Sequence, residues 1–327
     1  MKLSTYCNEL ISESQKYKPT YANGHLAIHL PMSLIALDKM GASKEQLSRF
    51  YSHSITKLDK RENTNALKIS SLSQELGNKE SFEEYVLYFK NQLLNKSISI
   101  VIEEALVILV KGISASAFHP AIRLSYAIEI NNTDEIIFSL ASWASEYLFF
   151  DNKFHSSSIG LEQMLAERNT ISVELNFSPG NIVDRMQEIT NSLNDKQINF
   201  QENSLTLNEI REFCIKKFHI RNNFTLLHTV TICKALDIIN EYIIDKKSFL
   251  NYVNEAILIA MLSTGINFSL AKEKLEIKFS SWEEVKQKAL NSNNDHVVKL
   301  VYTCWLEYEK FKNYKYQEVA ERAVLKL

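Results

Sequence analysis

Glycine and proline are the scarcest structural residues in this chain. There are 7 Gly and 4 Pro among 327 residues, far below average usage. Turns, hairpins and glycine-rich phosphate loops depend on these two residues, so such features must be few. A hydrophobic content of 45% and a charged content of 23% indicate a globular chain rather than a disordered one. We therefore predict an all-α fold, in which long helices are joined by short polar connections.

Apolar residues recur at helical spacing along most of the chain. Gly41 is typical of a helix end, and Ser43 with Gln46 forms a capping-box pattern that opens the next helix. Segment 98–110 is rich in β-branched residues, but its apolar positions follow helical spacing, which favours a helix. Further helices are predicted over residues 31–40, 81–94, 120–130, 134–150, 207–219, 225–242, 249–262, 282–290, 295–310 and 316–325.

Residues 151–205 form a more polar stretch that contains Pro179-Gly180, the one strong loop signal. We interpret this stretch as an insertion or lid. Because the histidines discussed below lie on both sides of it, residues 1–327 are predicted to form a single all-α domain.

Charge, cysteine content and hydropathy exclude several classes of partner. The net charge of −2 provides no broad basic field for nucleic acid. None of the four cysteines forms a CxxC pair, so we expect reduced thiols and a cytoplasmic protein. Residues 1–18 lack the apolar segment of a signal peptide. No apolar run approaches the roughly 20 residues that span a bilayer, so no membrane partner is expected.

Four histidines lie in or beside apolar helical stretches: His29, His119, His228 and His296. Leaving a buried polar group without a partner costs roughly 2 to 7 kcal/mol, and one metal ion would satisfy all four imidazoles. His29 and His119 each stand just before a proline at a helix start, which fixes the direction of the backbone. Taken singly, each histidine is equally well explained as a helix cap or as a core residue bonded to a carbonyl.

The other histidines lie in polar or mixed settings, where a surface or structural role is the better interpretation: His25, His53, His155 and His219. His25 precedes His29 by four residues, a spacing that shares one face of a helix. Gly24 and Pro31 argue against a regular helix there. We therefore keep His25 only as a candidate neighbour of the ligands, and its role stays open.

Lys299 follows His296 by three residues, so the two side chains share one helical face. Lysine is rarely buried without a partner, and a metal ion would repel its ammonium. Lys299 must therefore be neutral, form a salt bridge, extend to water or react with CO₂ to form a carbamate, which would be an anionic oxygen ligand. The alternative is an ordinary, partly exposed lysine.

Together, these motifs resemble the questin oxidase-like family, in the family's order. The matching segments are residues 29–37 with 41–42, 118–124 with 126–127, 228–231 and 295–301. The resemblance implies an oxygenase of aromatic polyketide pathways that performs Baeyer–Villiger-type or ring-opening oxidation. It also implies a non-haem iron site built from the four histidines, with Lys299 at or beside the metal. Ser33 stands where relatives carry a further histidine, so only His29 is carried over from the first motif.

The chemistry of the donors agrees with a metal-dependent oxygenase. Imidazole suits iron, zinc, copper and nickel, whereas a magnesium or calcium site would need carboxylates. No GxGxxG motif is present, so we expect no Rossmann-type flavin or NADPH site. The favoured hypothesis is an Fe(II)-dependent monooxygenase or dioxygenase that uses O₂ on a small aromatic molecule. The metal site would lie at the centre of a helix bundle, while the electron donor, NADPH dependence and oligomeric state stay open.

Aromatic residues near the motifs are candidates for a substrate pocket: Phe118, Tyr126, Trp143 and Trp305. Taken singly, each of them is better explained by core packing. Arg123 lies one turn after His119 and is a candidate for orienting a phenolate or carboxylate.

Two other functions remain open at this point. The first is a zinc-dependent or two-metal hydrolase, a class that uses His-Asp pairs. Only Asp295 and His296 adjoin, and we expect adjacent residues to face different ways on a helix. The second is a helical interaction protein whose histidines are structural.

Overall fold

The computed structural model describes residues 2–62, 66–150, 154–156, 159–198, 200–202, 205–269 and 280–325. Over these residues the chain forms fifteen α-helices, and its strands are confined to two short pairs. One pair, β1 (Thr20–Tyr21) with β2 (Leu26–Ala27), is antiparallel, and the other, β3 (Phe154–Ser156) with β4 (Phe200–Glu202), is parallel. The prediction of an all-α fold is confirmed.

The chain divides into two compact units. Unit 1 comprises Met1–Asn65, Arg123–Phe138 and Lys274–Leu327, and unit 2 comprises Ala66–Ile122 and Ser139–Glu273. The division falls within two helices, α6 (His119–Glu129) and α7 (Thr133–Ser145). Whether residues 1–327 act as a single domain stays a prediction.

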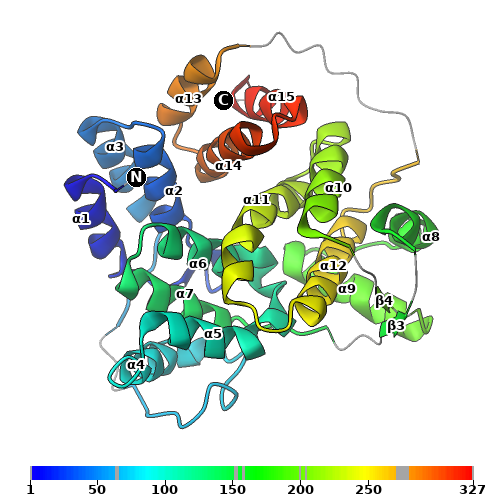
Figure 1. Ribbon diagram of the computed structural model, residues 1–327, viewed down its shortest axis with the longest axis horizontal. Coiled ribbons are helices and arrows are strands. Elements are labelled where there is room, and N and C mark those ends of the chain that lie inside the picture. The colour runs from blue at the N-terminus through cyan, green and yellow to red at the C-terminus, as the bar shows by residue number, and fades with distance from the viewer. Residues whose placement is uncertain are drawn as a thin grey trace. The chain divides into compact units, whose positions relative to one another are not determined.

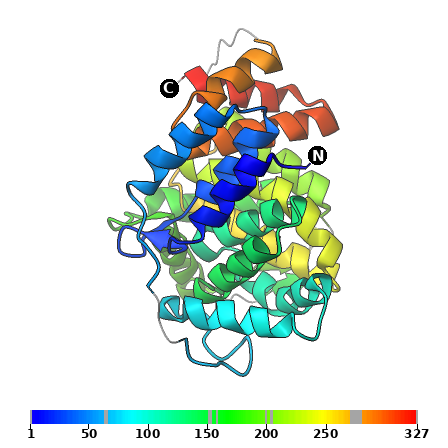
Figure 2. The same cartoon turned by 90° about the vertical axis from the view of Figure 1, so that its left-hand side faces the viewer.

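In unit 1, helices from the N-terminal and C-terminal parts of the chain pack together. Helix α2 packs against α1, α3 and α14, and α14 packs against α13 and α15 (Figure 1). Figure 2 shows the blue N-terminal helices beside the orange and red C-terminal ones. These helices are α1 (Thr5–Ser14), α2 (Leu30–Lys39), α3 (Lys44–Ile55), α13 (Trp282–Leu290), α14 (Asp295–Phe311) and α15 (Tyr314–Leu325).

The start and end of α2 follow from its sequence. His29 is its N-cap and Pro31 lies in its first turn, where a missing N–H costs no hydrogen bond. Gly41 ends the helix with a φ of +96°, a value that favours glycine. The chain then enters α3 through the predicted capping box, in which Ser43 and Gln46 bond reciprocally. These local predictions are confirmed.

Unit 2 is built around two helices that are buried over most of their length. Helices α11 and α12 are apolar on nearly every side, which is the pattern of a helix enclosed by others. Segment 98–110 is helical through Leu109, as predicted. The helices of this unit are α4 (Phe82–Gln92), α5 (Ile98–Leu109), α8 (Leu161–Glu174), α9 (Ile182–Asp195), α10 (Leu207–Ile220), α11 (Phe224–Ile239) and α12 (Lys246–Leu262). Four short 3₁₀ turns join them: η1 (Lys79–Ser81), η2 (Val110–Gly112), η3 (Ala115–Phe118) and η4 (Asn240–Tyr242).

Some elements differ from expectation. Helix α7 ends at Ser145 instead of 150, and the carbonyl of Leu148 beyond it accepts a hydrogen bond from Ser114. The polar stretch 151–205 contains α8 and α9. In α8 the buried side includes polar residues such as Arg168 and Asn169, which obscures its helical spacing, whereas α9 has regularly spaced apolar residues that the sequence-based prediction missed. The role of this stretch as a lid stays a prediction. Among the helices that the structure describes, none is long and apolar enough to cross a membrane.

Candidate metal centre

Unit 1 brings His29 and His296 together from opposite ends of the chain. His29 lies at the start of α2, and His296 lies in the first turn of α14, where Asn294 caps the helix by accepting from the His296 N–H. The two rings are nearly perpendicular, with centroids 4.4 Å apart. One ligand nitrogen of each ring lies within 4.8 Å of the other. This spacing allows both imidazoles to bind one metal ion.

Asp295 links these two rings. Its Oδ1 lies 2.7 Å from Nδ1 of His296, and its Oδ2 lies 3.1 Å from Nδ1 of His29. Lys57 adds a positive charge 3.5 Å from the same Oδ2. The expectation that Asp295 and His296 face different ways is wrong. Asp295 is the first residue of α14, and its carboxylate nevertheless reaches the ring of the next residue.

Burial and charge keep both imidazoles neutral near pH 7. Burial, followed by the positive charge of Lys299, lowers the pKa of His29 from 6.5 to about 3, against the opposing charge of Asp295. Burial also lowers the pKa of His296. Burial alone would raise the pKa of Asp295, but the two imidazoles outweigh it and hold that pKa well below its usual range. Neutral imidazole is the form that binds metals.

Lys299 lies on α14, one turn after His296, and is only 2% exposed. Burial lowers its pKa from 10.5 to about 8, with the charge of Asp295 opposing the shift. Within the described part of the chain, its amine takes part in no hydrogen bond or ion pair. This burial argues against a partly exposed lysine and against a lysine that extends to water. With a pKa of about 8 the amine is still largely protonated near pH 7, but it loses its proton more readily than an ordinary lysine. The carbamate stays a prediction.

Unit 2 brings His119 and His228 together in a second pair. His119 is the first residue of α6, and His228 lies in the second turn of α11. Their ring centroids are 4.8 Å apart. Nδ1 of His119 lies 2.5 Å from the Ser116 carbonyl, and Nδ1 of His228 lies 2.8 Å from the Phe224 carbonyl. Backbone carbonyls therefore face the Nδ1 atoms of His119 and His228, as the Asp295 carboxylate faces those of His29 and His296.

The Ser116 carbonyl is presented by an unusual turn. Ser116, Ala117 and Phe118 all have left-handed backbone angles, with φ of 45°, 53° and 71°. A left-handed conformation costs a residue with a Cβ roughly 1 to 2 kcal/mol. The Ser116 hydroxyl donates to Glu146 at 2.9 Å and helps to hold the turn. Such strain tends to gather at functional sites, and here it sets the acceptor for His119.

All four histidines therefore share one arrangement. In each ring, Nδ1 faces an oxygen of a carboxylate or a carbonyl. An N–H at Nδ1 leaves the lone pair on Nε2, and this is how metal-bound histidines are usually held from behind. The sequence identified the four rings, but it missed Asp295 as their shared acceptor in unit 1 and the carbonyls in unit 2. The acidic residue directly before His296 was the available signal for Asp295.

The remaining predicted site residues are buried and engaged in packing. Arg123 forms a two-point ion pair with Glu135, at 2.6 Å from Nε and 3.1 Å from a terminal nitrogen. Phe118, Tyr126 and Trp143 are almost fully buried, and the Trp143 indole donates to the Gly112 carbonyl. Trp305 is half-buried beneath the Lys286 ammonium. A role for these residues toward a substrate stays a prediction.

The other histidines differ in their exposure. His25 is exposed in the turn between β1 and β2, His53 is exposed on α3, and His219 is half-buried near the end of α10. The side chain of His155 lies outside the described residues. The expected surface position therefore holds for His53, whereas the role of His25 stays open.

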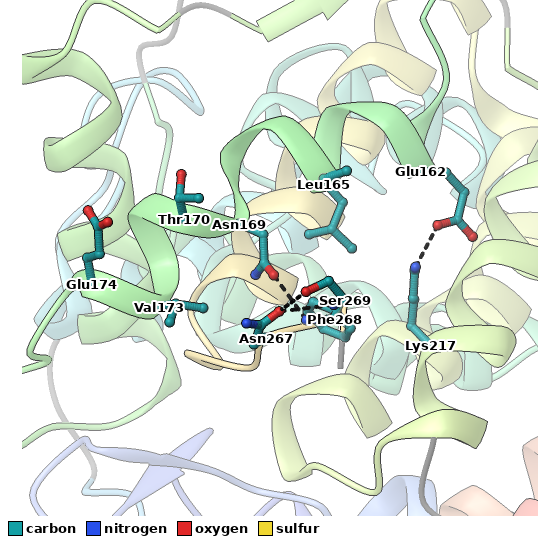
Figure 3. A pocket seen from close by; sticks show the side chains of 11 residues that line it. Glu162, Leu165, Asn169, Thr170, Val173, Glu174, Lys217, Asn267, Phe268 and Ser269 are labelled. Carbon is teal, nitrogen blue, oxygen red and sulfur yellow. Dashed lines mark hydrogen bonds and ion pairs between the residues drawn. The ribbon is translucent and has the colours of Figure 1, made fainter. Parts of the chain in front are cut away.

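Unit 2 also contains a pocket of about 340 Å³ between α8, α10 and the turn after α12. Figure 3 shows Asn169 directed at this turn, where it bonds to the Ile266 carbonyl and the Phe268 N–H, and Lys217 directed at Glu162. None of the predicted site residues lines this pocket.

Comparison with known proteins identifies the family. The questin oxidase-like family model matches residues 28–217, more than half of the chain. The chain belongs to the questin oxidase-like family. The matched segment contains His29 and His119, whereas His228, His296 and Lys299 lie beyond it. A search of curated proteins found no match. Membership suggests an oxidase of aromatic polyketide pathways.

Proposed function

We propose that this protein is a non-haem iron oxygenase, in which His29, His119, His228 and His296 bind one Fe(II) ion and O₂ oxidises a small aromatic or quinone-like molecule. Membership of the questin oxidase-like family supports an oxidase. The arrangement of the imidazoles supports the metal.

The single observation that carries the proposal is that Nδ1 of all four imidazole rings faces an oxygen atom of the protein. Nδ1 of each ring lies 2.5 to 3.1 Å from an oxygen, a placement that favours an N–H at Nδ1 and a lone pair on Nε2. Burial keeps His29 and His296 neutral, so no proton has to leave before a metal binds. Nitrogen donors of this kind suit iron, whereas they do not suit magnesium or calcium. The residues present therefore fit the implied metal.

The protein's own groups have separable tasks in this proposal. Asp295 fixes the direction of two rings and supplies negative charge behind them, which raises the basicity of both ligands. The Ser116 and Phe224 carbonyls fix the other two rings without adding charge. Iron, when bound, would supply the centre at which O₂ is activated. Aromatic side chains such as Tyr126 and Trp305 are the proposed neighbours of a Baeyer–Villiger-type or ring-cleaving oxidation.

Lys299 is proposed to complete the ligand set as a carbamate. Its neutral amine would attack CO₂, so that an N–C bond forms and one proton passes to water. The product carries one negative charge and two oxygen acceptors in place of a buried cation. An all-imidazole Fe(II) site has no such anion of its own. Complete burial and the lack of an ion pair in the described residues support this role.

Metal analysis tests the proposal. We expect protein purified without a histidine tag, and reconstituted without oxygen, to bind one Fe(II) per chain. His29→Ala and His228→Ala should each abolish that binding, although the two residues belong to different units. His53→Ala, which removes an exposed imidazole, is the matched control and should bind iron normally. Circular dichroism should show an intact helical fold in every variant, since a packed scaffold does not depend on the site.

Three results would overturn the proposal. Two metal ions per chain, one of them lost with each histidine pair, would assign a separate ion to each pair. Zinc retained in preference to iron, with hydrolysis of ester substrates, would favour a hydrolase. Normal metal content in both variants would leave the histidines with a structural role.

Lys299→Arg tests the carbamate, because arginine keeps the positive charge but cannot react with CO₂. We expect this variant to lose activity, and we expect added bicarbonate to raise the activity of the parent protein if carbamate formation is partial. Carbon-13 NMR after exposure to labelled CO₂ should show a carbamate signal in the parent and none in Lys299→Arg. A fully active Lys299→Arg variant with normal iron content would remove Lys299 from the mechanism.

A further inference from the structure

Tyr302 and Glu129 form a hydrogen-bonded pair in unit 1, in which Tyr302 is buried and Glu129 is half-buried. Tyr302 lies on α14 and is 1% exposed, and its hydroxyl donates to Oε1 of Glu129 on α6 at 2.5 Å. This distance is at the short end for a bond from a hydroxyl to a carboxylate, which is the strong, charge-assisted type. Burial, together with the charge and hydrogen bond of Glu129, raises the pKa of Tyr302 well above its usual range. Tyr302 is thus a neutral phenol with a carboxylate at its proton.

This pair lies on the same helix as two of the proposed site residues. Tyr302 follows His296 by six residues and Lys299 by three on α14, which places it about 9 Å along the helix axis from His296. The Tyr126 ring lies 5.8 Å from the Tyr302 ring, and the Trp305 ring lies 6.4 Å from it. Tyr302 is therefore the middle ring of a short aromatic series beside the proposed iron site.

A phenol is oxidised readily only when a base can accept its proton. The phenol radical cation is a strong acid, so oxidation is much easier when a base already accepts the O–H bond. Glu129 is in that position. We propose that Tyr302 is a redox-active tyrosine, which passes one electron to the oxidised metal site and its phenolic proton to Glu129.

The step is balanced within the residues named. With iron bound and oxidised by O₂, Tyr302 would lose one electron and its O–H bond, Glu129 would gain the proton, and the oxidised iron would take up the electron. A thiol or another one-electron donor would restore the phenol, with the proton returned from Glu129. The proposal rests on the proposed iron site as oxidant.

Trp305 is less favourable than Tyr302 as the site of the oxidised state. The Lys286 ammonium lies 4.6 Å from the centroid of its indole ring. A cation in that position favours the electron-rich ring and opposes a positive charge on it. We therefore expect the oxidised state to stay on Tyr302 instead of moving to the half-buried indole.

Photochemical oxidation of the metal-free protein tests the tyrosine independently of iron. Illumination with tris(bipyridine)ruthenium and persulfate, followed by freezing, should give a tyrosyl radical by electron spin resonance. Because the chain contains 14 tyrosines, the contribution of Tyr302 is the difference between the spectra of the parent and Tyr302→Phe, and this difference should be a tyrosyl signal. Tyr316→Phe is the matched control, because Tyr316 is equally buried in unit 1 but its bond to Glu307 is long, at 3.4 Å. Its signal should match that of the parent.

Glu129→Gln tests the proton acceptor. The amide oxygen can still accept the hydrogen bond but cannot take the proton, so the radical yield should fall and its dependence on D₂O should disappear. An undiminished radical in Tyr302→Phe, or a normal yield in Glu129→Gln, would overturn the assignment. Because these measurements use metal-free protein, failure of iron binding cannot produce either result.

The iron-loaded protein tests the oxidant. Treatment with hydrogen peroxide in the absence of an organic substrate should give the same radical in the parent and not in Tyr302→Phe. A radical formed by light but not by iron and peroxide would overturn the metal site as the oxidant.

Discussion

The two histidine pairs reach the same ring orientation by different means. In unit 1, a charged side chain, Asp295, faces Nδ1 of both His29 and His296. In unit 2, the acceptors are the backbone carbonyls of Ser116 and Phe224. The first pair is therefore sensitive to charge, pH and side-chain substitution. The second depends on backbone conformation, part of it strained.

This difference separates two ways to support a metal ligand. A carboxylate adds basicity to its ligands, but it is itself buried and must be balanced by charges such as Lys57. A carbonyl adds less, but it cannot be protonated or removed by a change of side chain. We expect the first pair to set the basicity of the ligands at the proposed metal site. We expect the second pair to set the position of its rings independently of pH.

The largest expected effect concerns buried charge in unit 1. Arg123→Gln should lower the free energy of unfolding by about 3 to 5 kcal/mol, because it leaves the Glu135 carboxylate buried without its cation. Chemical denaturation measures this change. The double variant with Glu135→Gln should recover most of the loss. If Arg123→Gln is as stable as the parent but loses activity, Arg123 serves the substrate and not the fold.

Acidification should weaken the metal-free protein through the first pair. The folded state holds the pKa of His29 at about 3 instead of 6.5, so the unfolded chain binds the proton more readily. Stability is therefore greatest above pH 6.5 and falls toward pH 3, by up to about 1.4 kcal/mol per pH unit for each proton. Denaturation from pH 7.5 to 5 measures this slope. His29→Gln should flatten it, whereas the exposed-site variant His53→Gln should not; equal slopes would contradict the assignment.

Removing the shared carboxylate should weaken metal binding by about 10- to 100-fold, the usual cost of losing the group behind a ligand. Asp295→Ala frees both rings of unit 1 at once. Asp295→Asn keeps one acceptor oxygen, so its affinity should lie between those of Asp295→Ala and the parent. Competition with a chelator measures the affinity. An unchanged affinity in Asp295→Ala would mean that the rings are held by packing alone.

The matched change in unit 2 should have the smallest effect. Phe224→Ala also truncates a residue that accepts from a histidine Nδ1, but the accepting carbonyl remains. The ring is 55% exposed and contacts His228 at 5.0 Å. Metal affinity should therefore change by no more than about twofold, as for an ordinary surface change. A loss as large as that of Asp295→Ala would show that the ring, and not the backbone, holds His228.

The helices could be predicted because they depend on local sequence patterns. The arrangement of the candidate site could be predicted less well, because it depends on contacts between residues distant in sequence. Apolar spacing located α5, α12 and α14 because helical periodicity is a property of neighbouring residues. The four histidines stood out because each lies in an apolar setting. Their grouping was predicted from the need for a shared partner and from the family resemblance, not from local spacing, because His29 and His296 meet through the packing of α2 against α14. The turn at Ser116 was also invisible, since three left-handed residues without glycine leave no sequence signal.

The carboxylate shared by His29 and His296 has a consequence for cooperativity. When one ring takes up a proton, it draws Asp295 toward itself and places a cation near the other ring, whose centroid is 4.4 Å away. The second proton is then bound more weakly than the first. Uptake of two protons by the metal-free site is therefore anticooperative and extends over a wider pH range than one histidine would span. A divalent cation meets no such obstacle, because both neutral rings can donate to it at once.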